Sequence, residues 1–270
     1  MTDLRPAALA FDAIAPVFDA RFSEWLSVAA QRKAVRRALL DTLPLYSRVL
    51  ELGGGTGEDA AWLARRGHRI LLTDPSPKMV ALAGAKLAPL GSRAEVAAAE
   101  ELETFAERHL ATGAGAFDAV FSNFAALNCV EDLAPVARGL ARLVKPGGAA
   151  ILVLFGVLSP GDVLVECLRG RPRQALRRFH RGACPARLGG QTFSVRYHRA
   201  KEVNHAFAPW FRPVRRVGIG VFVPPSAAEP WISQHPHLLR GLEMLDRIAG
   251  RPLAPLGDHI LYHLERTDAA

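Results

Sequence analysis

The sequence has few cysteines and no long apolar run. Its three cysteines, Cys129, Cys167 and Cys184, have neither metal-ligand spacing nor an even count, which predicts reduced thiols in a cytoplasmic protein and no metal site. No apolar stretch of about 18 residues occurs, so we expect no transmembrane helix. The first residues lack a basic segment followed by an apolar one, and we therefore expect no secretory signal.

Lysine is also scarce: of 34 basic residues, 29 are arginine and 5 are lysine. The net charge of +8 could serve nucleic acid, an anionic lipid surface or an acidic substrate. Abundant alanine and leucine beside so much arginine instead favour a composition bias with arginines solvated on helix faces, which disfavours nucleic-acid binding. At 270 residues the chain can bury a full core, most simply as one domain with an elaboration.

Residues 48–79 are the most informative stretch of the sequence. A short apolar run at residues 49–52 predicts a strand that is buried on both faces. A glycine cluster follows, then a helical pattern over residues 56–66 and a second apolar run over residues 69–73 that ends at Asp74. This order predicts one β-α-β unit.

The glycine cluster and Asp74 predict a nucleotide-like ligand. Glycines let a ligand approach the backbone, and the following helix presents free N–H groups. Asp74, 21 residues after Gly53, could accept hydrogen bonds from two ribose hydroxyls. The dinucleotide pattern G-x-G-x-x-G fails because its third glycine falls on Glu58, and no G-K-[ST] is present for a phosphate loop. The alternative is a purely structural glycine turn.

The pattern Glu51-x-Gly53-x-Gly55-x-Gly57 resembles motif I of the class I S-adenosylmethionine-dependent methyltransferases. The resemblance continues with residues 117–122, which begin with an acid at Asp118 and resemble motif II. It ends with the turn at residues 145–148 and the apolar run at 149–155, which resemble motif III. These matches cover residues 48–155 in order and imply S-adenosylmethionine as the cofactor.

The resemblance implies an α/β fold: a doubly wound, mostly parallel seven-stranded Rossmann-like sheet with an antiparallel last strand and an inserted cap. We expect an N-terminal helical lid at residues 1–46 and a cofactor-binding core at 47–155. An inserted cap that selects the substrate would follow at residues 156–197, and residues 198–270 would complete the core sheet.

The family's motifs also imply the cofactor-binding residues. An acid usually follows the third strand, but that position falls on Ala98 here, so Glu100, Glu101 or the backbone of Ala99 would replace it. The expected cofactor-binding residues are Glu51, Gly53, Gly54, Gly55, Gly57, Asp74, Pro75, Met79, Ala99, Glu100, Ser122 and Asn123.

The N-terminal segment Phe11-Asp12-Ala13-Ile14-Ala15-Pro16-Val17-Phe18-Asp19 resembles an opening segment of many small-molecule methyltransferases that folds over the cofactor. The resemblance implies a lid role for Phe11, Phe18 and Asp19. The alternative is an ordinary amphipathic helix on the sheet, since aromatics at this spacing usually belong to a core.

The remaining candidates concern the substrate and lie in several parts of the chain. Phe11, Phe18, Phe124, Asn128, Tyr197 and Trp210 are expected to bind the substrate. His198 or His205 could act as a general base, although either could equally be a core or surface histidine. The basic stretch meets an anionic acceptor, a membrane surface or only solvent; it comprises Arg169, Arg171, Arg173, Arg177, Arg178, Arg181 and Arg187.

The implied function is methyl transfer from S-adenosylmethionine to O, N or C of a small molecule. The chain is similar to the ubiquinone/menaquinone C-methyltransferase-like group, which suggests a lipid-like or quinone-type acceptor. Nucleic-acid methylation is disfavoured because Ser122-Asn123-Phe124-Ala125 stands where amino-methylating enzymes carry D/N-P-P-Y/F. A binding or scaffold protein that no longer methylates stays open as the alternative.

Overall fold

The computed structural model describes residues 4–268, which contain a seven-stranded sheet and a separate two-stranded hairpin. The strand order of the large sheet is β3-β2-β1-β4-β5-β9-β8. The first five strands run parallel, and β9 is antiparallel to both neighbours, which confirms the expected fold. The strands are β1 (Arg48–Leu52), β2 (Arg69–Asp74), β3 (Arg93–Val96), β4 (Phe117–Ser122), β5 (Val144–Phe155), β8 (Phe211–Ile219) and β9 (His259–Arg266).

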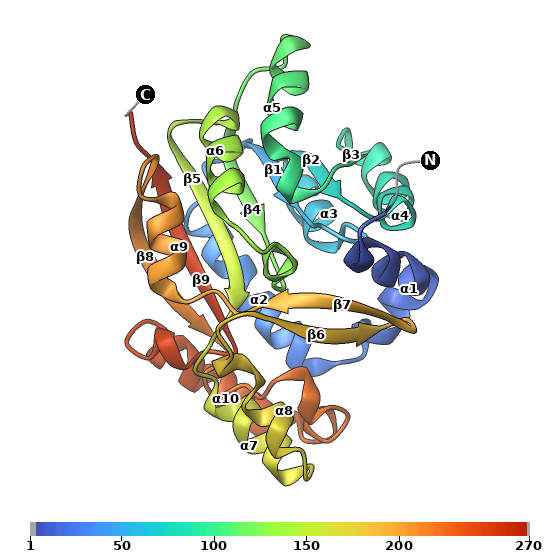
Figure 1. Ribbon diagram of the computed structural model, residues 1–270, viewed down its shortest axis with the longest axis vertical. Coiled ribbons are helices and arrows are strands. Elements are labelled where there is room, and N and C mark those ends of the chain that lie inside the picture. The colour runs from blue at the N-terminus through green and yellow to red at the C-terminus, as the bar shows by residue number, and fades with distance from the viewer. Residues whose placement is uncertain (1–3, 269–270) are drawn as a thin grey trace.

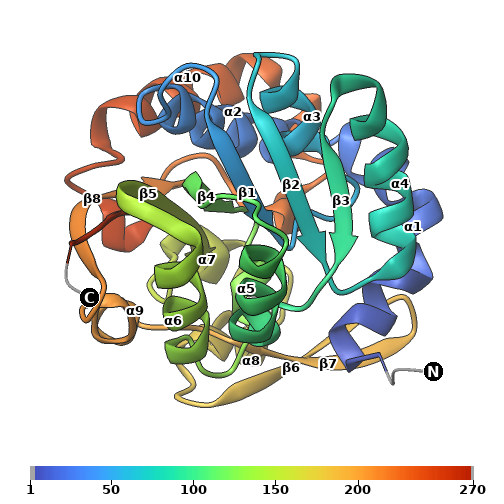
Figure 2. The same cartoon turned by 90° about the horizontal axis from the view of Figure 1, so that it is seen from above.

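Helices cover both faces of the sheet (Figure 2). One face packs on α2 (Leu26–Leu40), α3 (Glu58–Ala64) and α4 (Pro77–Leu87), and α10 (Pro236–Ala249) lies outside α2. The other face packs on α5 (Leu102–Ala111), α6 (Ala134–Leu143) and α9 (Ala200–Phe207). Each layer has its own apolar core, so the central strands are buried on both sides and read as continuous apolar runs.

The β-α-β unit forms as its residues predict. The side chains of Val49, Leu50 and Leu52 are fully buried in β1. Ser76 caps α4 by accepting a hydrogen bond from the Met79 N–H at 3.2 Å, and Pro77 occupies the first helical turn.

Some boundaries differ from the sequence-based expectation. Residues 145–148 belong to β5 as an irregularity in its pairing with β4, with Gly147 at φ +73°, and do not form a separate turn. The residue pattern favours a helix over residues 200–211 and a strand from residue 214, but α9 (Ala200–Phe207) ends at Phe207 and β8 begins at Phe211. Apolar residues continue across both boundaries, so hydrophobic periodicity alone does not locate them.

The insertion after β5 contains α7 (Pro160–Leu168), α8 (Pro172–Ala175) and a hairpin of β6 (Ala183–Leu188) and β7 (Gln191–Arg196). Strand β6 was not expected, because Pro185 and the surrounding arginines hide its alternation. Gly189 and Gly190 both have positive φ, which suits the two-residue turn that joins the strands.

The first helix, α1 (Pro6–Ser23), and the hairpin lie together beside the carboxyl ends of the parallel strands (Figure 1). Helix α2 packs on one face of the sheet. Ligands of open α/β sheets bind at the carboxyl ends of the strands. Within residues 4–268, no helix is both long enough and apolar enough to cross a lipid bilayer.

Candidate functional site

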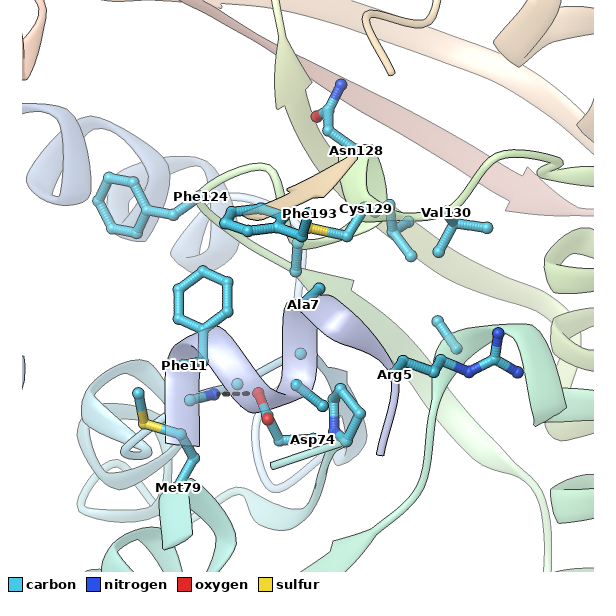
Figure 3. Close-up of a pocket in the computed structure, with 18 of the residues that line it drawn as sticks. Arg5, Ala7, Phe11, Asp74, Met79, Phe124, Asn128, Cys129, Val130 and Phe193 are labelled. Atoms are coloured by element: carbon cyan, nitrogen blue, oxygen red, sulfur yellow. Dashed lines mark hydrogen bonds between the residues drawn. The ribbon is translucent and has the colours of Figure 1, made fainter. Parts of the chain in front are cut away.

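A cavity of about 720 Å³ lies between the carboxyl ends of the strands, α1 and the β6–β7 hairpin. One end is formed by the glycine loop, Glu51 and Asp74. The other end is formed by α1, the segment after β4 and the hairpin. Figure 3 shows Phe11, Phe124 and Phe193 around the middle of this cavity, each from a different one of these segments.

The glycines of the loop after β1 have different tasks. A Cβ at Gly53 would lie 2.4 Å from the Cβ of Ala126, and one at Gly54 would lie 2.4 Å from Leu72 Cδ1. Gly53 and Gly54 are therefore required by packing. A Cβ at Gly55 would meet no described atom within 4 Å, so this glycine is the one that leaves its side open toward the cavity.

Asp74 holds the glycine loop at the end of β2. Its Oδ2 accepts a hydrogen bond from the Gly55 N–H at 2.9 Å, drawn in Figure 3, and its Oδ1 accepts one from the Ser76 N–H at 2.9 Å. Burial raises the pKa of Asp74 to about 6, although both hydrogen bonds lower it. Each carboxylate oxygen keeps a lone pair for a ligand.

Glu51 is a buried acid at the wall of the cavity. Its side chain is 2% exposed, and its Oε2 has no hydrogen-bond partner among the described residues. Burial and the nearby Asp59 raise the pKa of Glu51 well above its usual range. A buried, unpaired carboxyl is costly, and a cationic ligand group would satisfy it.

Arg32 of α2 also lines the cavity, although the helical pattern of residues 23–43 predicts that it is exposed to solvent. Its side chain is 22% exposed, its guanidinium lies 5.0 Å from the ring centre of Phe124, and its Nε has no hydrogen-bond partner in the described chain. It approaches Asp59 only at 3.9 Å, because Asp59 already pairs with Arg36 at 2.7 Å. Arg32 therefore keeps donors for an anionic ligand group.

Asn123 connects this charged cluster to the segment after β4. Its Nδ2 donates to Asp59 Oδ2 at 2.8 Å, and its Oδ1 accepts from the Phe124 N–H at 2.8 Å. Phe124 and Ala125 have φ values of +46° and +60°, which are costly for residues with a Cβ. This strained turn places the Phe124 ring at the cavity.

Two aspartates dock α1 on the loops around the cavity. Asp12 accepts from the Ser76 hydroxyl and the Lys78 N–H, both at 2.9 Å. Asp19 accepts from the Thr56 hydroxyl at 2.5 Å and pairs with Lys86 at 2.6 Å. Phe11 and Phe18, on the same helix, line the cavity.

The end of the cavity below the hairpin is mainly apolar. Phe193 packs 6.0 Å from Phe11 between ring centres, and Leu127 and Val130 lie nearby in the lining. Burial raises the pKa of Cys129 to about 12, so its thiol stays protonated at neutral pH. Asn128 donates to Arg196 O at 2.6 Å and accepts from the Phe155 N–H at 3.0 Å, so its amide is engaged by the backbone.

Most of the expected site residues come together in this cavity. Those in its lining are Glu51, Gly53, Gly54, Gly55, Asp74, Pro75, Met79, Ala99, Glu100, Asn123, Phe11, Phe18, Phe124 and Asn128. Gly57 and Ser122 lie outside the lining. A Cβ at Gly57 would press on Ala83 at 3.1 Å, and the Ser122 hydroxyl donates to Leu52 O at 3.0 Å.

Four other expected residues also lie outside the lining. The Tyr197 hydroxyl accepts from Arg177 at 3.2 Å, and Trp210 packs against the core between β8 and α9. His198 and His205 line a separate, smaller hollow beside α9. His198 is buried with its Nε2 2.9 Å from Val130 O, and burial lowers its pKa. Neither histidine lines the larger cavity, so we propose no general-base role for them.

The arginines of the basic stretch at residues 169–187 do not line this cavity. Arg178 is 4% exposed, and Arg177 and Arg178 both pair with Asp162 at 2.9 Å. Only the hairpin portion of the insertion, with Phe193 and Arg196, lines the cavity. No group of three His, Cys, Asp or Glu side chains in residues 4–268 is arranged to hold a metal ion.

Comparison with known proteins agrees with this geometry. Residues 49–148 match the family described as a methyltransferase domain. The biotin biosynthesis bifunctional protein BioHC of Cellvibrio japonicus is 30% identical over 170 residues, which are 62% of this chain and 30% of that protein. Demethylmenaquinone methyltransferase of Chlorobaculum tepidum is 30% identical over 151 residues, which are 53% of this chain and 57% of that protein. The chain thus spans less than two thirds of each relative.

A solved structure supports the fold. The crystal structure of an S-adenosylmethionine-dependent methyltransferase from Mesorhizobium loti matches 88% of this chain and 98% of its own, with a TM-score of 0.54 and 21% identity. At that identity the likeness concerns the fold alone. The methyltransferase-domain match over residues 49–148, the strand order and this fold thus agree with one another, and the chain carries a methyltransferase domain of Rossmann-like fold.

Proposed function

We propose that this chain transfers a methyl group from S-adenosylmethionine to an apolar small molecule. The observation that carries the proposal is the division of one cavity into two ends. One end carries an acid and an arginine, each with a buried atom that lacks a hydrogen-bond partner in the described structure, beside an open glycine; the other is lined mainly by apolar side chains.

The charged end suits the amino-acid part of the cofactor. Glu51 would accept hydrogen bonds from its ammonium, and Arg32 would donate to its carboxylate. Both side chains have an atom without a hydrogen-bond partner in the described structure, as expected for groups that await a ligand. Asp74 would hold the ribose hydroxyls, and Gly55 would let the ligand approach the backbone.

The remaining cofactor contacts follow from the lining next to Asp74. Pro75 and Met79 lie at the start of α4, and Ala99 and Glu100 lie after β3. We propose that these residues surround the adenine. Ala98 offers no carboxylate at the family's usual position, so the acid nearest this part of the lining is Glu100, which also pairs with Arg5 at 3.3 Å.

The apolar end suits an acceptor with little charge. When bound, the cofactor supplies an electrophilic methyl group, and the surrounding residues need to orient the acceptor and exclude water. Phe11, Phe124 and Phe193 provide flat apolar surfaces for this task. Cys129 keeps its proton at neutral pH, so it does not act as a base here. The carboxylates in this part of the lining are Glu131 and Asp132, so a base for the acceptor would come from these and not from the thiol.

These features support a quinone-type or lipid-like acceptor. One relative is named demethylmenaquinone methyltransferase, and that name is consistent with a flat, apolar acceptor. The hairpin β6–β7 and α1 would select it, since both cover the apolar end.

The test is transfer of a labelled methyl group. Purified protein is incubated with S-adenosylmethionine carrying a deuterated methyl and with a panel of apolar hydroxylated aromatics and demethylated quinones, and products are identified by mass spectrometry. The proposal expects a labelled product together with S-adenosylhomocysteine. Saturable cofactor binding without transfer of the methyl group to any small molecule, including any that is retained by the purified protein, would instead support a scaffold role.

A further inference from the structure

Helix α7 has its amphipathic pattern reversed relative to the core of the domain. Its two acids, Asp162 and Glu166, are one helical turn apart and are only 1% and 4% exposed. Its leucines Leu164 and Leu168, also one turn apart, are 60% and 79% exposed. A helix that covers a domain normally presents the opposite arrangement.

Ion pairs explain why Asp162 faces inward, and Glu166, one turn later on the same face, follows it although its Oε2 has no hydrogen-bond partner in the described structure. Asp162 pairs with Arg177 and with Arg178, each at 2.9 Å. Arg178 continues to Asp258 at 2.7 Å and donates to the carbonyl oxygens of Gly156 and Asp258. This buried cluster fastens the insertion to the ends of β5 and β9. The orientation of α7 is thus fixed, and its leucines face solvent as a consequence.

More apolar surface and several arginines surround these leucines in sequence. Leu176 and Phe179, after α8, are 61% and 40% exposed. Arg169, Arg171, Arg173 and Arg181 are exposed as well. Figure 1 places α7 and α8 at one end of the molecule, away from α5 and α6. We call this surface, formed by the exposed side chains of residues 164–181, the leucine–arginine surface.

The charge of this surface is positive only. Residues 156–197 contain eight arginines and two acids, and so contribute +6 to the net charge of +8. The buried Asp162 pairs with Arg177 and Arg178, and the buried Glu166 lies 3.8 Å from Arg169. Within the described residues, neither acid pairs with the exposed Arg171, Arg173 or Arg181. From the exposed leucines and exposed arginines of this one segment we infer that the leucine–arginine surface docks on an anionic lipid bilayer.

The combination of residue types favours lipid over other anionic partners. Leucine side chains gain by entering the acyl boundary of a membrane, while arginines pair with phosphate headgroups. A single-stranded nucleic acid would instead be held by exposed aromatic rings along a basic groove. The docked insertion carries the hairpin over the apolar end of the cavity, but the inference does not depend on methyl transfer.

The experiment is co-sedimentation of the full chain with vesicles, without cofactor. Vesicles of phosphatidylcholine alone are compared with vesicles that also contain phosphatidylglycerol. We expect binding only to the anionic vesicles, and weaker binding as salt is raised. The double variant Leu164→Ser/Leu168→Ser should weaken binding at least about tenfold, because two exposed apolar side chains no longer enter the bilayer.

Controls separate this result from misfolding and from other partners. Leu45→Ser changes a leucine that is 80% exposed before β1 and should bind vesicles as the wild type does. Unchanged binding of the double variant would overturn the inference by showing a purely electrostatic contact. Absence of binding to anionic vesicles, or a dimer in light scattering that the double variant abolishes, would overturn it as well. Retained cofactor affinity in the double variant shows that the fold and the proposed cofactor site are intact.

Discussion

The surroundings of Glu51 indicate most specifically which ligand group binds in the cavity. Its pKa is raised by burial, so the carboxyl holds a proton more readily than a free glutamate. An ammonium placed against it would stabilise the charged form and lower its pKa. Binding should therefore release protons at pH values between the lowered pKa of the bound state and the raised pKa of the free protein, and affinity should rise as pH rises through that range.

This prediction is checked by calorimetric titration of S-adenosylmethionine in two buffers that differ in ionisation enthalpy. The apparent binding enthalpy should differ between the buffers in the direction of proton release. Glu51→Gln keeps the shape of the side chain but has no proton to lose there, so the buffer dependence should shrink and binding should weaken. Proton uptake on binding by the wild type would contradict this role.

The glycines of the loop give a second prediction at the scale of single residues. Gly55→Ala introduces a Cβ that meets no described atom but imposes a backbone cost of about 1–2 kcal/mol at φ +55°. We expect a folded protein with a lower Tm and cofactor affinity reduced at least about tenfold. Gly53→Ala would clash with Ala126 and should lower Tm further.

Thermal unfolding and calorimetry of the two variants check this contrast. Cofactor affinity of Gly55→Ala equal to that of the wild type would place the ligand away from Gly55. The sequence motif implies that Gly53 contacts the cofactor, and Gly53 does line the cavity, but the missing Cβ at this position is required by packing against Ala126.

At the scale of elements, α1 is held over the site by few polar contacts. Asp12 and Asp19 dock it on α4 and on the glycine loop. Removing both carboxylates with Asp12→Ala/Asp19→Ala should loosen α1. Each substitution removes charge-assisted hydrogen bonds, and one such bond contributes about 1.5–3 kcal/mol. Hydrogen exchange of α1 amides should then be faster, and cofactor should dissociate faster.

The matched control is Asp41→Ala, which removes an exposed carboxylate at the end of α2. It should leave exchange in α1 and the rate of cofactor dissociation unchanged. If the double variant also behaves like the wild type, α1 is a fixed part of the domain and not a cover that controls ligand release.

The β-α-β unit could be predicted from the sequence because its determinants are local. The buried strands are short apolar runs, and Ser76 and Pro77 mark the start of α4. The hairpin could be predicted only in part, since Pro185 and the arginines obscure β6. The roles of Arg32 and Arg177 depend on partners distant in the chain, so the sequence showed only basic positions.

At the scale of the whole molecule, the chain combines a seven-stranded Rossmann-like sheet with an insertion, for which we propose two roles: covering the cavity and docking on a bilayer. The sheet brings Glu51 and Asp74 to one edge, and the hairpin and α1 enclose that edge. The rest of the insertion is fastened by the Arg178–Asp258 pair and exposes the leucine–arginine surface. Cofactor binding and surface docking thus belong to separate parts of the molecule and can be tested independently.

The central claim is that the chain binds S-adenosylmethionine in the cavity at Asp74. Its most direct measurement is calorimetric titration of S-adenosylmethionine into the wild type and into Asp74→Ala. The wild type should bind one cofactor per chain in a saturable way, and the variant should bind roughly ten- to a hundredfold more weakly, because charge-assisted hydrogen bonds to the ribose are lost. No saturable binding by the wild type, or a loss under about threefold in the variant, would contradict the claim.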